Sequence, residues 1–245
     1  MTEGSIKIRG GVVLPARRED IELHTSDGLT LVGELAMPLS GAPVATVVTL
    51  HPLPTAGGFM DSHILRKAAA RLPALADIAV VRFNFRGVTS PRGTSQGTFG
   101  NGVDEGLDLG AAMEFVAARQ LPNPWLLGWS FGTDVLLAHG RDYPVGGVIL
   151  LSPPLRTTTE AELATWAGFG ASITALIPEF DDYLRPAAAA LRFAPIPKID
   201  LVAVDGGKHL WVGEDQTSRV LTETVARLNP GVLPLPTTWE ATSAS

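Results

Sequence analysis

Ser130 lies between two glycines in the segment Gly128-Trp129-Ser130-Phe131-Gly132, which fits the pattern G-x-S-x-G. In this pattern the serine can be a nucleophile if it sits on a sharp turn between a strand and a helix. Its hydroxyl then attacks a carbonyl carbon once a neighbouring base takes the proton. Because a five-residue match arises easily by chance, the surrounding sequence has to support this interpretation.

A serine nucleophile needs a base, and histidine is the most common one. The chain has five histidines: His24, His51, His63, His139 and His209. Where this serine motif is catalytic, the acid and the histidine follow the serine along the chain. His139 lies on the helix predicted directly after Ser130, and we expect it to be a solvated residue at the helix end. His209 is therefore the predicted base, and Gly206 and Gly207 allow its loop to bend back over the sheet.

A carboxylate is needed to orient the histidine. The segment PEFDDYLRP (residues 178–186) offers Glu179, Asp181 and Asp182, at the end of the strand that precedes the strand before His209. Spacing alone does not choose among the three, and one of them is expected to cap a helix beginning at Tyr183. Asp205, four residues before His209, is a rival that we interpret as a turn residue.

The elements that must position these groups alternate along the chain between strands and helices. Residues 21–38 read as a hairpin that turns at Ser26-Asp27-Gly28. The further predicted strands are residues 44–50, 78–85, 124–129, 146–151, 172–177 and 199–204. The predicted helices are residues 61–75, 103–120, 131–141, 160–166, 183–192 and 215–228. This order predicts an α/β fold: one domain with an approximately eight-stranded, mostly parallel sheet, an antiparallel N-terminal hairpin and helices on both faces.

Composition limits the classes of function. With 45% hydrophobic and 18% charged residues, the 245-residue chain reads as a compact globular protein, and its net charge of −6 argues against nucleic-acid binding. The absence of cysteine excludes thiolate chemistry. We find no signal-peptide pattern, no apolar run long enough for a membrane span and no metal-ligand spacing. We therefore expect a cytoplasmic protein without metal or cofactor.

Several motifs, taken in order, resemble the α/β-hydrolase superfamily. They are HPLPTAGG (residues 51–58), VRFNFRGVTSPRGTSQG (81–97), DEGLD (104–108), LLGWSFG (126–132) and the later Asp181 and His209. They are most similar to the small, lidless bacterial branch related to dienelactone-hydrolase-like and acyl-aminopeptidase-like serine hydrolases. The resemblance covers roughly residues 21–228 and implies a serine hydrolase fold and activity.

The resemblance also implies roles for individual residues. It implies Asp181 as the acid, although Pro178 stands where the family usually has glycine. It implies the backbone N–H groups of Leu53 and Phe131 as the oxyanion hole. Leu53 is also favoured by its neighbours, because Pro52 and Pro54 have no N–H to donate.

Other residues receive structural interpretations. We expect His51 to support its loop and Arg86 to anchor the loop after its strand, with Glu105 or Asp108 as partner. Four aromatic residues could line an acyl pocket or equally belong to the core: Phe59, Trp129, Trp166 and Trp211.

The predicted function is a serine hydrolase that cleaves esters or related small acyl compounds through Ser130, His209 and Asp181. Two alternatives stay open: a silent hydrolase-fold binding protein, and an acyltransferase or thioesterase with the same triad. We expect residues 1–20 to be an N-terminal extension, 21–229 the hydrolase domain and 230–245 a Pro/Thr/Ser-rich tail. About twenty residues separate the strands at 146–151 and 172–177, too few for a large lid.

Overall fold

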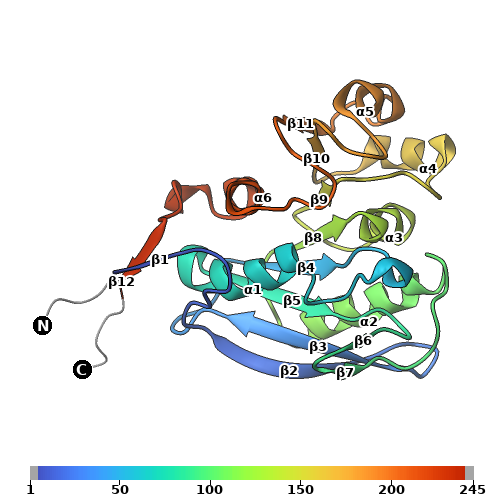
Figure 1. The fold of residues 1–245 in the computed structure, drawn as a ribbon. Helices are drawn as coiled ribbons and strands as arrows, with labels where there is room; N and C mark the ends of the chain where they lie inside the picture. Colours follow the sequence, from blue (N-terminus) through green and yellow to red (C-terminus); the bar gives the residue numbers. More distant parts are fainter. Residues whose placement is uncertain (1–4, 241–245) are drawn as a thin grey trace, which may run out of the picture.

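A computed structural model describes residues 5–240 of the chain, and an eight-stranded sheet forms its centre (Figure 1). The order across this sheet is β11 (Asp200–Val204), β10 (Ser172–Pro178), β9 (Gly147–Leu151), β8 (Pro124–Trp129), β4 (Ala45–Leu50), β5 (Ile78–Phe83), β3 (Thr30–Met37) and β2 (Arg17–His24). The strands from β11 to β5 are parallel, whereas β3 pairs antiparallel with both β5 and β2. The predicted fold class is confirmed, including the antiparallel hairpin at one edge.

Burial explains which strands are central. Strands β4, β5 and β9 are buried at every residue, as expected for short apolar runs covered on both faces. Strand β2 is exposed except at Ile21 and Leu23, which suits an edge strand with charged residues. It begins at Arg17, so the sheet includes the last four residues of the predicted N-terminal extension.

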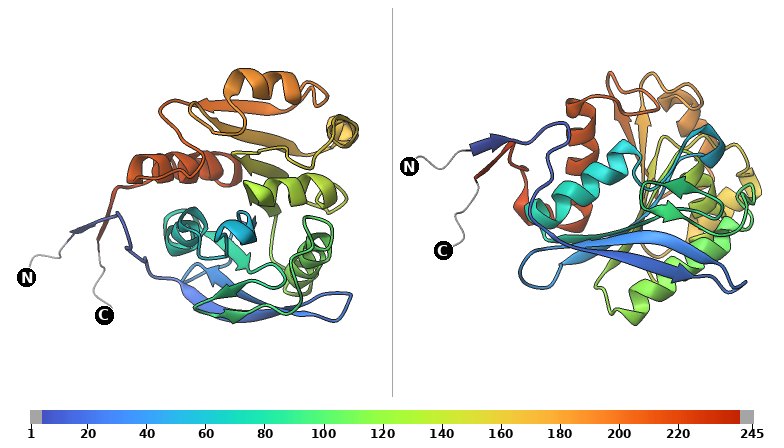
Figure 2. Two further views of the ribbon diagram at one scale, coloured as in Figure 1. Left: turned by 45° about the vertical axis from the view of Figure 1, so that its right-hand side comes forward. Right: turned by 60° about the horizontal axis from the view of Figure 1, so that its bottom comes forward.

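Helices cover both faces of the sheet, which separates the core into two apolar clusters (Figure 2). Helices α1 (His63–Ala76) and α6 (Glu214–Leu228) bury their apolar faces on one side. On the other side lie α2 (Glu105–Ala118), α3 (Phe131–His139), α4 (Glu160–Thr165) and α5 (Pro186–Arg192). The six predicted helices are present, and α4 with the short 3₁₀ helix η2 (Trp166–Gly168) occupies the connection from β9 to β10.

Helix α5 begins at Pro186, three residues later than predicted. Proline is well suited to the first turn of a helix, because it has no N–H to satisfy there. The residues before it are instead held by Asp181, whose Oδ1 accepts hydrogen bonds from the backbone N–H groups of Tyr183 (2.8 Å) and Leu184 (3.0 Å). The expected cap is thus a turn that precedes the helix.

Two small sheets and two further 3₁₀ helices complete the described residues. Strand β1 (Ser5–Lys7) pairs with β12 (Thr238–Glu240), which lies in the predicted tail, beside the chain ends in Figure 1. Strands β6 (Thr89–Ser90) and β7 (Gly93–Thr94) form a short hairpin. The 3₁₀ helices are η1 (Pro54–Ala56) and η3 (Pro230–Val232). Residues 241–245 of the predicted tail lie outside the described residues. Over residues 5–240, no helix is long and apolar enough to cross a membrane.

Candidate active site

Ser130 occupies the sharp turn between β8 and α3. Its φ of 53° and ψ of −119° place a non-glycine residue in a region that side chains rarely adopt. The glycines on either side make this turn possible. A Cβ on Gly132 would lie 2.2 Å from the carbonyl oxygen of Leu50, and a Cβ on Gly128 would lie 2.6 Å from the oxygen of Gly132. The turn therefore excludes any larger residue at these two positions.

Ser130, His209 and Asp181 form one hydrogen-bonded chain. Nε2 of His209 lies 2.8 Å from Oγ of Ser130, and Nδ1 lies 2.9 Å from Oδ2 of Asp181. Since the carboxylate can only accept, Nδ1 carries the proton and Nε2 is free to accept the proton of the serine hydroxyl. The three predicted side chains come together in the arrangement that a serine nucleophile requires, and their catalytic role stays a prediction at this point.

Asp181 is held in the charged form by its partners. Burial by itself raises the pKa of this carboxyl, which is 1% exposed. The hydrogen bond with His209 and those from the amides of Leu184 and Tyr183 outweigh burial, so the pKa lies below its ordinary value. The carboxylate is therefore ionised at neutral pH and can orient the imidazole.

The pairing of β10 with β11 explains why Asp181 and His209 meet. These strands are parallel, with Pro178 opposite Val204, so the loops that follow leave the sheet at the same edge. Two hydrogen bonds then join the loops: Phe180 N–H to Gly207 O (2.9 Å) and Gly206 N–H to Oε2 of Glu179 (2.8 Å).

The other candidate acids have different positions. Glu179 ties the two loops together, as described above. Asp182 and Asp205 are exposed and form no side-chain hydrogen bond within residues 5–240. Asp205 lies in a turn, as predicted. Of the four carboxylates, the structure brings only Asp181 into hydrogen-bond distance of His209.

Two aromatic side chains from other elements hold the backbone next to His209. Nε1 of Trp129 donates to the carbonyl oxygen of His209 (3.2 Å), and Nε2 of His63 donates to that of Leu210 (2.6 Å). Trp211, which is fully buried, has a φ of 52°. The loop is thus fixed by polar contacts and by an anchored indole in a strained backbone conformation. Sequence analysis did not identify His63 as a supporting residue, since the contact joins positions far apart in the chain.

A cavity of about 410 Å³ opens beside Ser130. Its lining residues come from the loops at the carboxyl ends of the strands: Pro52, Leu53, Thr55, Ala56, Phe99, Asn101, Ser130, Phe131, Asp134, Pro154, Arg156, Thr157, Tyr183, His209 and Leu210. Within the described part of the chain, the backbone N–H groups of Leu53 and Phe131 donate no hydrogen bond. Both amides belong to cavity residues and are free to bind an oxygen of a ligand.

Asp134 and Arg156 are cavity residues that sequence analysis missed. Asp134 is buried on α3, and its Oδ1 accepts hydrogen bonds from Oγ1 of Thr158 (2.9 Å) and the N–H of Thr157 (3.4 Å). Burial raises the pKa of this carboxyl above its ordinary value. Its position four residues after the nucleophile was visible in the sequence, but the loop that it holds was not.

His51 has the supporting role that was predicted. The ring is completely buried; Nε2 accepts from the N–H of Phe85 (3.0 Å), so Nδ1 carries the proton and donates to the oxygen of Pro52 (2.7 Å). Burial lowers the pKa of His51 to about 4. The ring also packs on that of Phe85, with centroids 4.5 Å apart.

The four aromatic residues proposed as a pocket wall do not line this cavity. Trp129 and Trp211 belong to the core on the side of α1 and α6, because alternate residues of a strand face opposite sides. Trp166 is buried on the other side, where its Nε1 donates to the oxygen of Leu137 (2.9 Å). Phe59 borders an adjacent hollow instead. The observed aromatic lining consists of Phe99, Phe131 and Tyr183.

Two further expectations concern Arg86 and His139. Arg86 is an anchor, paired with Asp108 (2.8 Å) and Asp27 (3.0 Å), whereas Glu105 accepts hydrogen bonds from the backbone before α2. The expectation that His139 is solvated is wrong. It is half-buried, and its Nε2 donates to the oxygen of Gly102 (2.8 Å), because the end of α3 packs on the start of α2.

Comparison with protein families and curated sequences gives limited information. No protein-family model matches the chain. An uncharacterized protein of Rickettsia prowazekii (strain Madrid E) is 37% identical over 122 residues. This alignment covers 47% of the chain and 47% of that protein, so the chain matches about half the length of this relative.

Solved structures match over most of the chain. An α/β serine hydrolase homologue from Coxiella burnetii is 25% identical with a TM-score of 0.71, over 86% of this chain and 97% of that protein. A serine hydrolase without a lid from Xanthomonas campestris is 27% identical with a TM-score of 0.69, over 90% and 95%. An esterase from Pyrococcus furiosus, 18% identical with a TM-score of 0.68 over 87% and 93%, shows the shared fold alone. The chain therefore has the α/β-hydrolase fold in the form of the lidless α/β serine hydrolases.

Proposed function

We propose that this chain is a serine hydrolase that cleaves carboxylic esters or related small acyl compounds through an acyl-enzyme intermediate. The observation that carries the proposal is the hydrogen-bonded chain from Ser130 through His209 to Asp181, at the edge of an open cavity. The similarity to serine hydrolases of Coxiella and Xanthomonas supports the same reaction class.

In the first half of the proposed reaction, Nε2 of His209 takes the proton of Ser130 while Oγ attacks the carbonyl carbon of the substrate. The negative charge that develops on the carbonyl oxygen is stabilised by the backbone N–H groups of Leu53 and Phe131. His209 then gives its proton to the leaving alcohol, and the acyl group remains bonded to Ser130. Asp181 stabilises the imidazolium without taking its proton.

In the second half, His209 removes a proton from water, whose oxygen attacks the acyl carbon. The same two amides stabilise the second oxyanion, and His209 returns the proton to Oγ as the acid product leaves. The short connection that contains α4 leaves the cavity open to small or exposed acyl groups.

A fluorophosphonate probe tests the proposal directly, because it reacts with an activated serine hydroxyl. We expect mass spectrometry to locate a single phosphonyl adduct on Ser130, and the Ser130→Ala variant to remain unlabelled. Thr133→Ser is a suitable control, because it places another hydroxyl near the turn without an adjacent histidine. Labelling of another residue, or of none in the folded protein, would contradict the hydrolase proposal and favour a silent binding protein.

Product analysis separates hydrolysis from acyl transfer. With an ester substrate in the presence of a competing alcohol or thiol, we expect the free acid as the main product. If the acyl group went mainly to the added alcohol or thiol, the transferase alternative would replace hydrolysis.

A further inference from the structure

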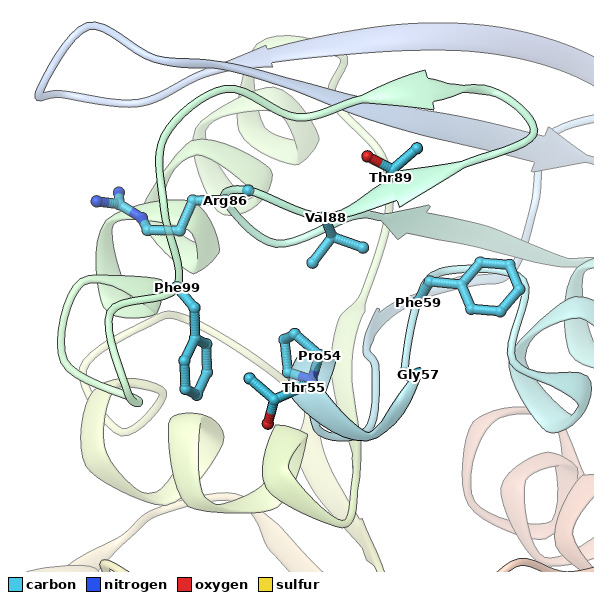
Figure 3. Close-up of a pocket in the computed structure, with 10 residues that line it drawn as sticks. Pro54, Thr55, Gly57, Phe59, Arg86, Val88, Thr89 and Phe99 are labelled. Atoms are coloured by element: carbon cyan, nitrogen blue, oxygen red, sulfur yellow. The ribbon is translucent and has the colours of Figure 1, made fainter.

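A second hollow of about 270 Å³ adjoins the cavity beside Ser130 (Figure 3). It lies between the loop that contains η1 and the segment that leads into the β6–β7 hairpin. Its lining residues are Pro54, Thr55, Gly57, Gly58, Phe59, Arg86, Gly87, Val88, Thr89 and Phe99. Thr55 and Phe99 line both spaces, so the hollow is continuous with the cavity at these two side chains.

The lining of this hollow suits an uncharged, apolar group. Arg86 is the charged residue among those that line it, and its guanidinium is paired with Asp27 and Asp108. Figure 3 shows this guanidinium directed away from the hollow and Val88 directed into it. Pro54 and Phe99 add further apolar surface, so transfer of an alkyl group from water into this space is favourable.

The order of the strands indicates which part of an ester would reach the hollow. Ser130 follows β8, and His209 follows β11, on one side of β8 in the sheet. The hollow is built by residues that follow β4 and β5, on the other side. Because His209 must protonate the leaving alcohol, the alcohol lies on the side of β11. The acyl chain then extends toward β5, past Thr55 and Phe99.

Phe99 is well placed to divide the two spaces. Its half-buried ring packs against that of Phe131, with centroids 5.4 Å apart. The proposed oxyanion donor Phe131 therefore lies directly beside the passage. A short acyl group would end before this ring, and a longer one would pass it.

We propose that the hollow lined by Val88, Thr89 and Phe99 is an acyl-chain subsite, and that this chain acts on esters with extended, apolar acyl groups. This inference rests on the proposed hydrolase function. It assigns the acyl side of substrate specificity to the η1 loop and the β6–β7 segment.

The test compares 4-nitrophenyl acetate, butyrate, hexanoate, octanoate and decanoate. For the wild-type protein we expect kcat/KM to rise with acyl length beyond butyrate. Val88→Phe fills the hollow with a larger side chain and is expected to lower kcat/KM for octanoate by about tenfold, the effect of roughly two methylene groups left in water. Its kcat/KM for acetate should remain within about twofold of wild type.

Thr89→Trp is a second variant, because Thr89 is exposed and Val88 is buried, where a larger side chain can impair folding. Val44→Trp is the matched control, since the exposed Val44 precedes β4 at the opposite edge of the sheet. It should keep the wild-type dependence on acyl length.

Two results would overturn the acyl-chain subsite: a wild-type preference for acetate over every longer ester, or an unchanged length dependence in folded Val88→Phe and Thr89→Trp. Failure of the hydrolase function itself looks different. In that case no ester is cleaved and Ser130 is not labelled, whereas failure of the subsite alone leaves acetate hydrolysis intact.

Discussion

The loops after β4 and β11 each carry a buried histidine, and the two rings have opposite surroundings. His51 uses both nitrogens on backbone groups, with Phe85 N–H on one side and Pro52 O on the other. His209 uses both nitrogens on side chains that can exchange protons, Ser130 and Asp181. Burial is similar, so the partners and not the degree of burial distinguish a structural histidine from a candidate base.

The protonation chemistry follows from these partners. The neutral ring of His51 is favoured because burial lowers its pKa to about 4 and only one tautomer satisfies both contacts. His209 has a carboxylate behind it that stabilises the protonated ring when a proton arrives. The following changes test whether this contrast holds, from the largest expected effect to the smallest.

Replacing His209 with alanine should abolish ester hydrolysis almost completely. Loss of the base from a serine triad lowers kcat on the order of a millionfold. The measurement is the hydrolysis rate together with thermal unfolding, because the loop remains tied through Trp211 and the backbone contacts. If His209→Ala kept more than about one percent of wild-type activity, His209 would not be the base.

Asp181→Asn should reduce kcat by about ten-thousandfold, because the amide no longer selects the tautomer that leaves Nε2 free. Asp182→Asn is the neighbouring control and should keep activity, since its side chain is exposed. Steady-state kinetics of both variants decide the assignment. Equal losses, or a greater loss in Asp182→Asn, would identify a different carboxylate.

Acidification should destabilise the protein through His51. In the unfolded chain its pKa is near 6.5, and in the folded protein it is about 4. The unfolded state binds the proton first as the pH falls, so the contribution is fully present above pH 6.5 and is lost toward pH 4. The loss amounts to roughly 3 kcal/mol of unfolding free energy.

Urea unfolding at a series of pH values measures this contribution. His51→Leu keeps a side chain of similar size but cannot be protonated, and its stability should fall less steeply over the same pH range. At high pH the variant should still be less stable by about 1–3 kcal/mol, because the buried N–H of Phe85 loses its acceptor. Parallel pH dependences of variant and wild type would exclude His51 as the source.

Trp129→Phe should have the smallest effect. It removes the hydrogen bond from Nε1 to the oxygen of His209 and should lower kcat by several-fold to tenfold while KM stays similar. Trp125→Phe is a matched control on the same strand and face, because Nε1 of Trp125 has no hydrogen-bond partner within the described residues. A loss of the same size in both variants would indicate a general packing effect and not support of the His209 loop.

The sequence by itself determined the fold class and the three residues of the candidate triad. The alternation of short β-branched runs with amphipathic helices leaves few topologies for a parallel sheet, so the strand ends before Ser130, Asp181 and His209 had to share one edge. The motif order added the choice of Asp181 over Glu179 and Asp182, which spacing did not make. Helix starts were less certain, as the late start of α5 at Pro186 shows.

Only the tertiary structure decided what surrounds these residues. Trp129 reads equally well as core or pocket wall, and its side is set by the alternation of β8 and the helix that covers it. The contacts of His63 with Leu210, and of Asp134 with Thr158, join segments whose separation in the chain carries no periodic signal. The cavity and the adjoining hollow arise where loops from several strands meet. Local patterns determine elements and their order, whereas pockets depend on side-chain packing between distant segments, which no local pattern encodes.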